Sequence, residues 1–180
     1  MGVRVEQDGR WNVGGLSVFP EAEFTRPADT TQYTANDVVA QSTTAASNKL
    51  LVFRNCVLVP GGTGILYSGL LFASTDAATN PNFSLALFNT EDITIAADNA
   101  ASTVTDAQAR NMVAAGTFDG TNGANVHTLG ANLVITATSI GQTFKCAEGS
   151  RNLYGLVIDR GGYTPASAEN FRFRLGILPD

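Results

Sequence analysis

The sequence is poor in the residues that usually carry chemistry. Its 180 residues contain one histidine and two cysteines. Cys56 and Cys146 lie in separate apolar runs, so they match neither a C-x-x-C redox pair nor a zinc knuckle, and we expect two buried free thiols. His127 has no carboxylate or second histidine beside it at catalytic or ligand spacing. These shortages argue against an enzyme, and they predict no catalytic residue, no metal and no other cofactor.

Charge and long apolar runs are scarce as well. Charged residues make up 15% of the chain, against roughly 25% in soluble domains, and the net charge is −5 with no basic stripe. Nucleic-acid binding is therefore not expected. No apolar run is long enough for a bilayer span, and the first ten residues lack the apolar core of a secretory signal. We expect synthesis in a reducing cytoplasm, no membrane partner and no small-molecule substrate.

The sequence does contain many short segments with strand character. Apolar side chains recur at every second position or in brief runs, and turn residues separate these runs. In "FRFRLGIL" the apolar side chains point to one face, while Arg172 and Arg174 point to the other and are candidate interface residues. The predicted strands are Trp11–Phe19, Val38–Gln41, Leu50–Pro60, Gly64–Ser74, Asn82–Asn89, Gly116–Phe118, Leu133–Thr138, Asn152–Asp159 and Phe171–Leu178.

One helical segment interrupts this pattern. In "TDAQARNMVAAG", Thr105 and Gln108 have the spacing of a capping box, and Gly116 can end the helix. The following segment, "FDGTNGANVHTLGAN" at residues 118–132, is expected to be a long exposed loop or a hairpin tip. The fold class is therefore all-β, and eight or nine strands with one short helix predict a jelly-roll β-sandwich, with a closed barrel or an immunoglobulin-like sandwich as alternatives.

A single domain is predicted over residues 25–180. Residues 1–24 form an N-terminal segment that is either an arm laid over a neighbour or the first strand, and Trp11 within it is a candidate interface residue. Glu21 and Glu23 are interpreted as surface acids, because glycosidase carboxylates normally come from separate elements. Asp98 is interpreted as an ordinary loop residue.

The most site-like stretch is "FTRPADTTQYTANDVV", residues 24–39. Pro27 fixes its own backbone, and Asp29 with the two threonines after it can accept bonds from neighbouring amides. Tyr33 can bury its ring while its hydroxyl is tied down, and Arg26 can pair with Asp29. Asn36 can adopt a left-handed turn before the next strand. Each polar side chain therefore has a structural use, and the stretch is predicted to brace the fold.

The same stretch resembles a signature of tailed-bacteriophage virion proteins, T-R-P-x-[DN]-T-T-x-Y-x-x-x-D-V-V. The matching residues are Thr25, Arg26, Pro27, Asp29, Thr30, Thr31, Tyr33, Asp37, Val38 and Val39. Such sequences often have Gly where this one has Asn36. Weaker similarity continues through "GILYSGLLFAS", "FSLALFN", "AADNAAS", "LYGLVIDRGGYTPAS" and "FRFRLGILPD".

The resemblance implies a head decoration, or capsid cement, protein with a jelly-roll domain. Such a protein binds the outside of an assembled capsid, bridges subunits of the major capsid protein, and is expected to be a homotrimer on the virion surface. It is made in the cytoplasm of the bacterial host. The alternative is a carbohydrate-binding or receptor-binding module of the phage head or tail. For that role the visible candidates are Trp11, Tyr163 and the loop of residues 119–127.

Overall fold

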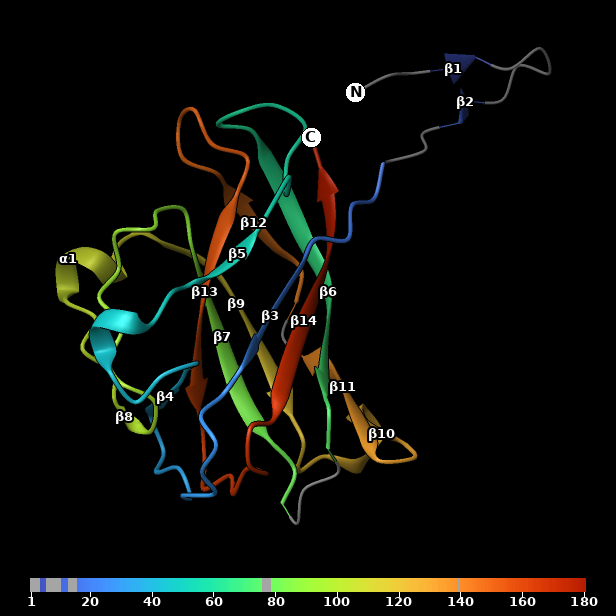
Figure 1. Ribbon diagram of the computed structural model, residues 1–180. Coiled ribbons are helices and arrows are strands. Elements are labelled where there is room, and N and C mark those ends of the chain that lie inside the picture. The colour runs from blue at the N-terminus through green and yellow to red at the C-terminus, as the bar shows by residue number, and fades with distance from the viewer. Residues whose placement is uncertain (1–3, 6–10, 13–15, 76–78, 139) are drawn as a thin grey trace.

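The fold is a sandwich of two antiparallel β-sheets. A computed structural model describes residues 4–5, 11–12, 16–75, 79–138 and 140–180. In Figure 1, β3, β14 and β6 lie in one layer, and β13, β7 and β9 lie in the other. The strands are β1 (Arg4–Val5), β2 (Trp11–Asn12), β3 (Glu21–Thr25), β4 (Asp37–Val39), β5 (Leu51–Phe53), β6 (Thr63–Ala73), β7 (Asn82–Phe88), β8 (Ala100–Ala101), β9 (Met112–Asp119), β10 (Val126–Leu129), β11 (Asn132–Thr138), β12 (Gln142–Lys145), β13 (Leu153–Asp159) and β14 (Asn170–Pro179).

The strand order is that of a jelly roll. One sheet runs β3-β14-β6-β11, and the other runs β9-β7-β13, after which β4 and β5 pair with successive parts of β13. If β4 and β5 count as one interrupted strand, there are eight principal strands, and the chain changes layer at each step except between β7 and β9, as in two Greek keys. The predicted all-β jelly-roll sandwich is confirmed. The strands outnumber the eight or nine predicted, because short strands such as β8, β10 and β12 extend the sheets.

The two edges of the sandwich differ. On one side β11 pairs with β6 through Leu133–Thr136 and with β9 through its last two residues, so this strand joins the sheets. On the other side β3 pairs with β14 and β5 pairs with β13, and the described residues show no ladder between β3 and β5. The sandwich is thus closed along β11 and open between β3 and β5.

The predicted alternation in β14 is confirmed. Phe171, Phe173 and Ile177 are fully buried between the sheets, while Arg172 is exposed. Phe171 meets Phe83 of the opposite sheet edge-to-face, with ring centroids 5.2 Å apart. A second apolar cluster, which includes Phe88 and Leu156, lies on the outer face of β13 and β7 beneath the segment of residues 89–104. Both layers are therefore fixed by apolar packing.

The predicted helix is correct at its start and wrong in its length. The capping box between Thr105 and Gln108 is present, but α1 covers only Asp106–Ala109. From Met112 the chain forms β9 and pairs with β7 along its whole length, with alternate residues buried. Ladder bonds and burial outweigh the weak helical preference of an Ala-rich run. Gly116 therefore lies inside a strand instead of ending a helix.

Five strands were not predicted, namely β1, β3, β8, β10 and β12. Among them, β3 contains Glu21 and Glu23, whose charges hid its strand character, and β10 lies in the stretch expected to be a loop or a hairpin tip. The predicted strand Leu50–Pro60 ends instead at Phe53, because Asn55 adopts a left-handed backbone with φ 57°. Two short 3-10 helices, η1 (Ala45–Ser47) and η2 (Gly123–Asn125), lie in connections.

The structure describes only part of the predicted N-terminal segment, residues 1–24. Trp11 lies in β2, which pairs with β1, but its side chain is outside the described residues. Residues 13–15 of the predicted first strand are also outside the described residues. Further along, Val18 bridges to Ile177 of β14, so the chain joins the sheet edge just before β3.

Candidate functional site

The stretch of residues 24–39 encloses a buried cation. Arg26 follows β3 directly, is 2% exposed, and its amide donates to the Glu169 carbonyl at 3.0 Å. Its Nε donates to the Tyr33 hydroxyl at 2.9 Å, and one terminal nitrogen donates to the Asp29 carbonyl at 2.7 Å. The other donates to the carboxylates of Asp29, at 3.2 Å, and Asp98, at 3.0 Å. We call Arg26, Asp29, Tyr33 and Asp98 the clamp.

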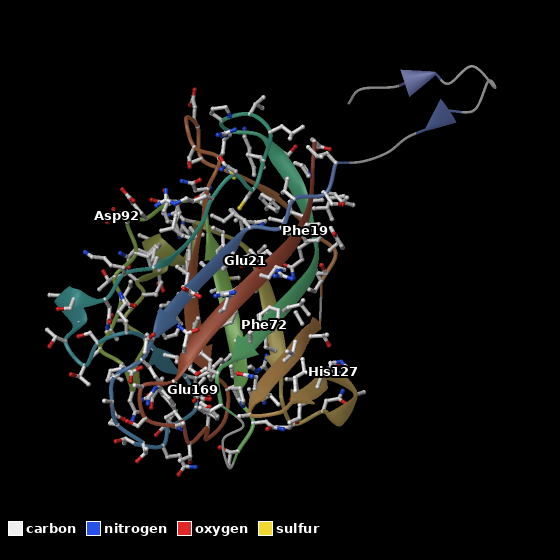
Figure 2. The ribbon with its side chains drawn as sticks, turned by 45° about the vertical axis from the view of Figure 1, so that its right-hand side comes forward. Phe19, Glu21, Phe72, Asp92, His127 and Glu169 are labelled. Atoms are coloured by element: carbon white, nitrogen blue, oxygen red, sulfur yellow. The ribbon has the colours of Figure 1, made fainter. Side chains whose placement is uncertain are left out.

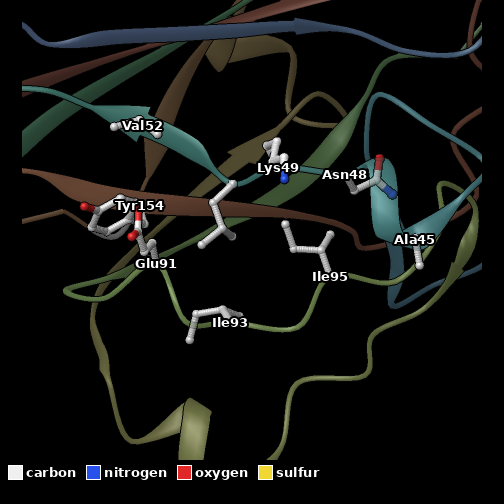
Figure 3. Close-up of a pocket in the computed structure, with 9 residues that line it drawn as sticks. Ala45, Asn48, Lys49, Val52, Glu91, Ile93, Ile95 and Tyr154 are labelled. Carbon is white, nitrogen blue, oxygen red and sulfur yellow. The ribbon is translucent and has the colours of Figure 1, made fainter.

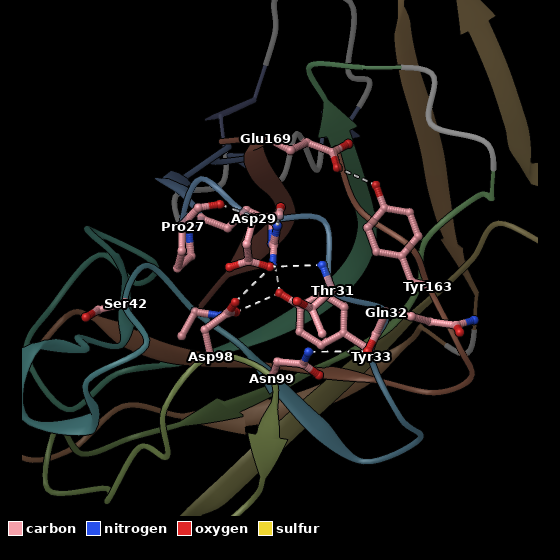
Figure 4. Close-up of polar contacts among 12 residues, drawn as sticks. Pro27, Asp29, Thr31, Gln32, Tyr33, Ser42, Asp98, Asn99, Tyr163 and Glu169 are labelled. Carbon is pink, nitrogen blue, oxygen red and sulfur yellow. Dashed lines mark hydrogen bonds and ion pairs between the residues drawn. The ribbon is translucent and has the colours of Figure 1, made fainter. Parts of the chain in front are cut away.

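Asp98 is the member of the clamp that the sequence analysis missed. It is 5% exposed, although it was interpreted as an ordinary loop residue. Its carboxylate accepts from the Tyr33 hydroxyl at 2.6 Å and from the Ala40 amide at 2.8 Å, in addition to Arg26 (Figure 4). These partners lie 58 to 72 positions away along the chain. The weakly similar stretch "AADNAAS" contains Asp98, but no local pattern gives it a role in the clamp.

The electrostatics of the clamp are those of a buried, fully bonded ion pair. Burial raises the pKa of Asp98 above its ordinary value, against the bonds from Ala40, Tyr33 and Arg26. Burial alone lowers the pKa of Arg26, but its bonds to Tyr33 and the nearby carboxylates outweigh burial and raise that pKa. Burial together with the Asp98 carboxylate also raises the pKa of Tyr33. The phenol is thus held as a neutral donor, which suits a fixed structural network.

The other signature residues mostly shape the backbone. Asp29 accepts from the Thr31 amide at 3.1 Å, as predicted, and Asp37 accepts from the Thr34 amide at 2.7 Å. Asn36 has φ 78°, so it takes the left-handed turn that was predicted for it. Among the signature threonines, Thr25 accepts from the Asn170 side chain at 3.2 Å, and Thr30 is exposed. Pro27 accepts from the Ala168 amide through its carbonyl.

Tyr163, a candidate aromatic residue for carbohydrate binding, lies in the core instead. It is 1% exposed, its ring stacks on Tyr33 with centroids 6.4 Å apart, and its hydroxyl donates to the buried Glu169 (Figure 4). His127, from the loop named with it, lies in the exposed part of β10. The clamp and this second pair together fill one end of the sandwich with bonded polar groups.

The outer face of the β3-β14-β6 sheet carries the predicted interface arginines. Arg172 pairs with Glu23 at 2.8 Å, Arg174 pairs with Glu21, and both arginines keep over two fifths of their side chains exposed. Arg174 also lies over the ring of Phe72, 5.3 Å from its centroid. Figure 2 shows Glu21 and Phe72 on this face, with Phe19 further toward the end of β14.

Next to these two ion pairs, the same face carries exposed apolar side chains. We call Phe19, Ile65, Tyr67 and Leu178 the apolar patch, since each exposes more than a third of its surface. Leu178 and Ile65 are opposite each other in the ladder between β14 and β6. Exposed apolar side chains that gather next to charges are typical of protein-binding surfaces.

Cys56 and Cys146 are free and buried, as predicted, and burial raises their pKa values to about 12 and about 11. Across the described ranges, no group of three or more His, Cys, Asp or Glu is placed to hold a metal ion. Within the same ranges, no helix has the length and hydropathy of a membrane span.

No protein-family model matches the chain, and no curated protein matches its sequence.

Proposed function

We propose that the protein is a structural virion protein that binds the outside of an assembled phage capsid and bridges subunits of the major capsid protein. The observation that carries this proposal is the outer face of the β3-β14-β6 sheet, where the apolar patch adjoins paired charges. Burying such a patch supplies binding energy without leaving an isolated charge in the interface. The jelly-roll fold and the virion signature of residues 25–39 add support.

The proposed mechanism is stabilisation by selective binding. A protein that binds assembled shell, but not separated subunits, stabilises the shell by mass action. Weak contacts that are repeated by symmetry add through avidity, and we propose that the protein acts as a homotrimer. The clamp serves this role indirectly, because it fixes the end of β3 and the chain that leads into β4.

Co-sedimentation with empty capsid shells that lack the protein tests the proposal, together with a mass measurement in solution. We expect saturable binding, and loss of binding in the double variant Ile65→Ser and Leu178→Ser. The matched control is Leu129→Ser, since Leu129 is 62% exposed on β10, away from the patch. Binding to cell-surface glycan without binding to shells would instead favour a receptor-binding module.

A further inference from the structure

The open edge of the sandwich leaves strand backbone without a partner. β3 and β5 each pair on one side, and no backbone bond among the described residues reaches the other side of either strand. An unpaired strand edge is a template for an added strand. A bridging protein also needs a second contact besides its outer face.

Two grooves flank β5. One, of about 390 Å³, lies between β3 and β5 and is lined by residues 22–25 and 49–52 with Arg54. The other, of about 450 Å³, lies between β5 and the segment that carries Ile93 and Ile95, and Tyr154 of β13 lines it as well (Figure 3). Lys49, Leu50 and Val52 line both grooves. A strand added at β5 would therefore find apolar surface for its side chains next to the backbone edge.

The exposed charges along this edge are mostly positive. Lys49 and Arg54 bracket β5, Arg151 shares a third groove with Arg54, and all three are exposed. None of them forms an ion pair with a residue that the structure describes. Of the acids nearby, Glu23 is paired with Arg172, and Glu91 lies at the rim of the larger groove. In a chain of net charge −5, this local excess of cations is unusual.

We infer that the edge of β5 binds an extended, acidic segment of a partner protein as an added strand. Main-chain bonds to β5 supply the affinity, the groove lined by Leu50 and Val52 takes alternate apolar side chains, and Lys49 and Arg54 select acids at the ends of the segment. The inference rests on the proposed function, in which that segment belongs to the major capsid protein.

A synthetic peptide tests the edge by itself. The probe is a ten-residue strand-forming peptide of alternating Val and Thr with two Asp at each end, and the same peptide with Lys in place of Asp is its control. We expect the Asp peptide to bind in fluorescence anisotropy and to slow hydrogen exchange at residues 51–53. The Lys49→Glu, Arg54→Glu variant should lose about tenfold in affinity, and more at low salt.

The matched control variant is Arg110→Glu, Lys145→Glu, which reverses two exposed cations on other elements. Equal binding of the Asp and Lys peptides, protection outside β5, an equal loss in both variants, or no binding of the Asp peptide up to about 1 mM would overturn the inference.

Shell binding separates this inference from the proposed function. If wild type binds shells and the Lys49→Glu, Arg54→Glu variant binds them equally well, the edge is not the contact and the proposed function survives. If wild type binds no shells while the Asp peptide binds at β5, the proposed function fails and the acceptor edge stands.

Discussion

The clamp and the open edge use similar residues in opposite ways. Within the clamp, Arg26 has partners on every guanidinium nitrogen and is 2% exposed. Along the open edge, Lys49 and Arg54 are exposed and make no ion pair with the described residues. A buried cation must be hydrogen-bonded and ion-paired within the fold, because it has lost its water. An exposed cation is hydrated and remains free to bind a partner. The comparison separates the polar groups that hold the fold from those available for binding.

The largest expected effect is in the clamp. Arg26→Met should lower the free energy of unfolding by about 3–5 kcal/mol, because Asp98 would keep a buried charge without its cation. Urea denaturation measures this loss. The matched control is Arg172→Met, whose pair with Glu23 is about half exposed and should contribute much less than the buried pair. Equal losses in both variants would remove the distinction between the two kinds of arginine.

Tyr33→Phe should have the next largest effect. It removes the hydroxyl that donates to Asp98 and accepts from Arg26. Asp98 then lacks one donor, and Arg26 Nε lacks its acceptor. We expect a loss of about 1–3 kcal/mol in urea or thermal unfolding. Tyr67→Phe, in the apolar patch, should change stability by less than about 0.5 kcal/mol. If Tyr33→Phe leaves the free energy of unfolding unchanged, water replaces the hydroxyl and the clamp is more hydrated than its burial indicates.

The sequence predicts the parts of this molecule that have a local cause. Alternation in "FRFRLGIL" identifies β14 and its outward arginines, and the turn residues of the stretch at 24–39 predict the Asx turn at Asp29 and the left-handed Asn36. Each of these depends on residues within a few positions. The jelly-roll class follows from the number and spacing of such strands.

What the sequence does not predict depends on distant contacts. Asp98 looks like any loop acid, because its partners come from other parts of the chain. The acidic β3 is held in the sheet by its pairing with Arg172 and Arg174 of β14, about 150 positions away. The open edge is likewise a property of the strand order, since β5 reads as an ordinary apolar run.

A smaller effect is expected from Asp159, a buried acid close to the clamp. Its Oδ2 accepts from the amides of Gly161 and Gly162, while its Oδ1 has no partner, and burial raises its pKa. The folded protein therefore keeps this proton at pH values where the unfolded chain, with a pKa of about 3.9, has lost it. The stability that Asp159 contributes is greatest at low pH and is lost as pH rises through the folded-state pKa.

Asp159→Asn removes that dependence. Relative to wild type, the variant should gain stability as pH rises from about 4 to 7, because the wild type alone must then bury a charge. Urea denaturation across this range measures the difference, and acids such as Asp29 and Asp119, whose pKa values are lowered, cancel because both proteins contain them. If the difference in the free energy of unfolding between the two proteins does not change with pH, Asp159 is solvated, unlike Asp98.

The smallest effect should come from the open edge itself. In the isolated protein, Lys49→Glu with Arg54→Glu should change the free energy of unfolding by less than about 0.5 kcal/mol, because neither cation has a partner to lose among the described residues. Thermal unfolding at low and high salt measures it, with Arg110→Glu, Lys145→Glu as the control. A loss of more than about 1 kcal/mol, specific to the first variant and screened by salt, would mean that the fold already uses these cations. The edge would then resemble the clamp, and its charge would no longer point to a binding partner.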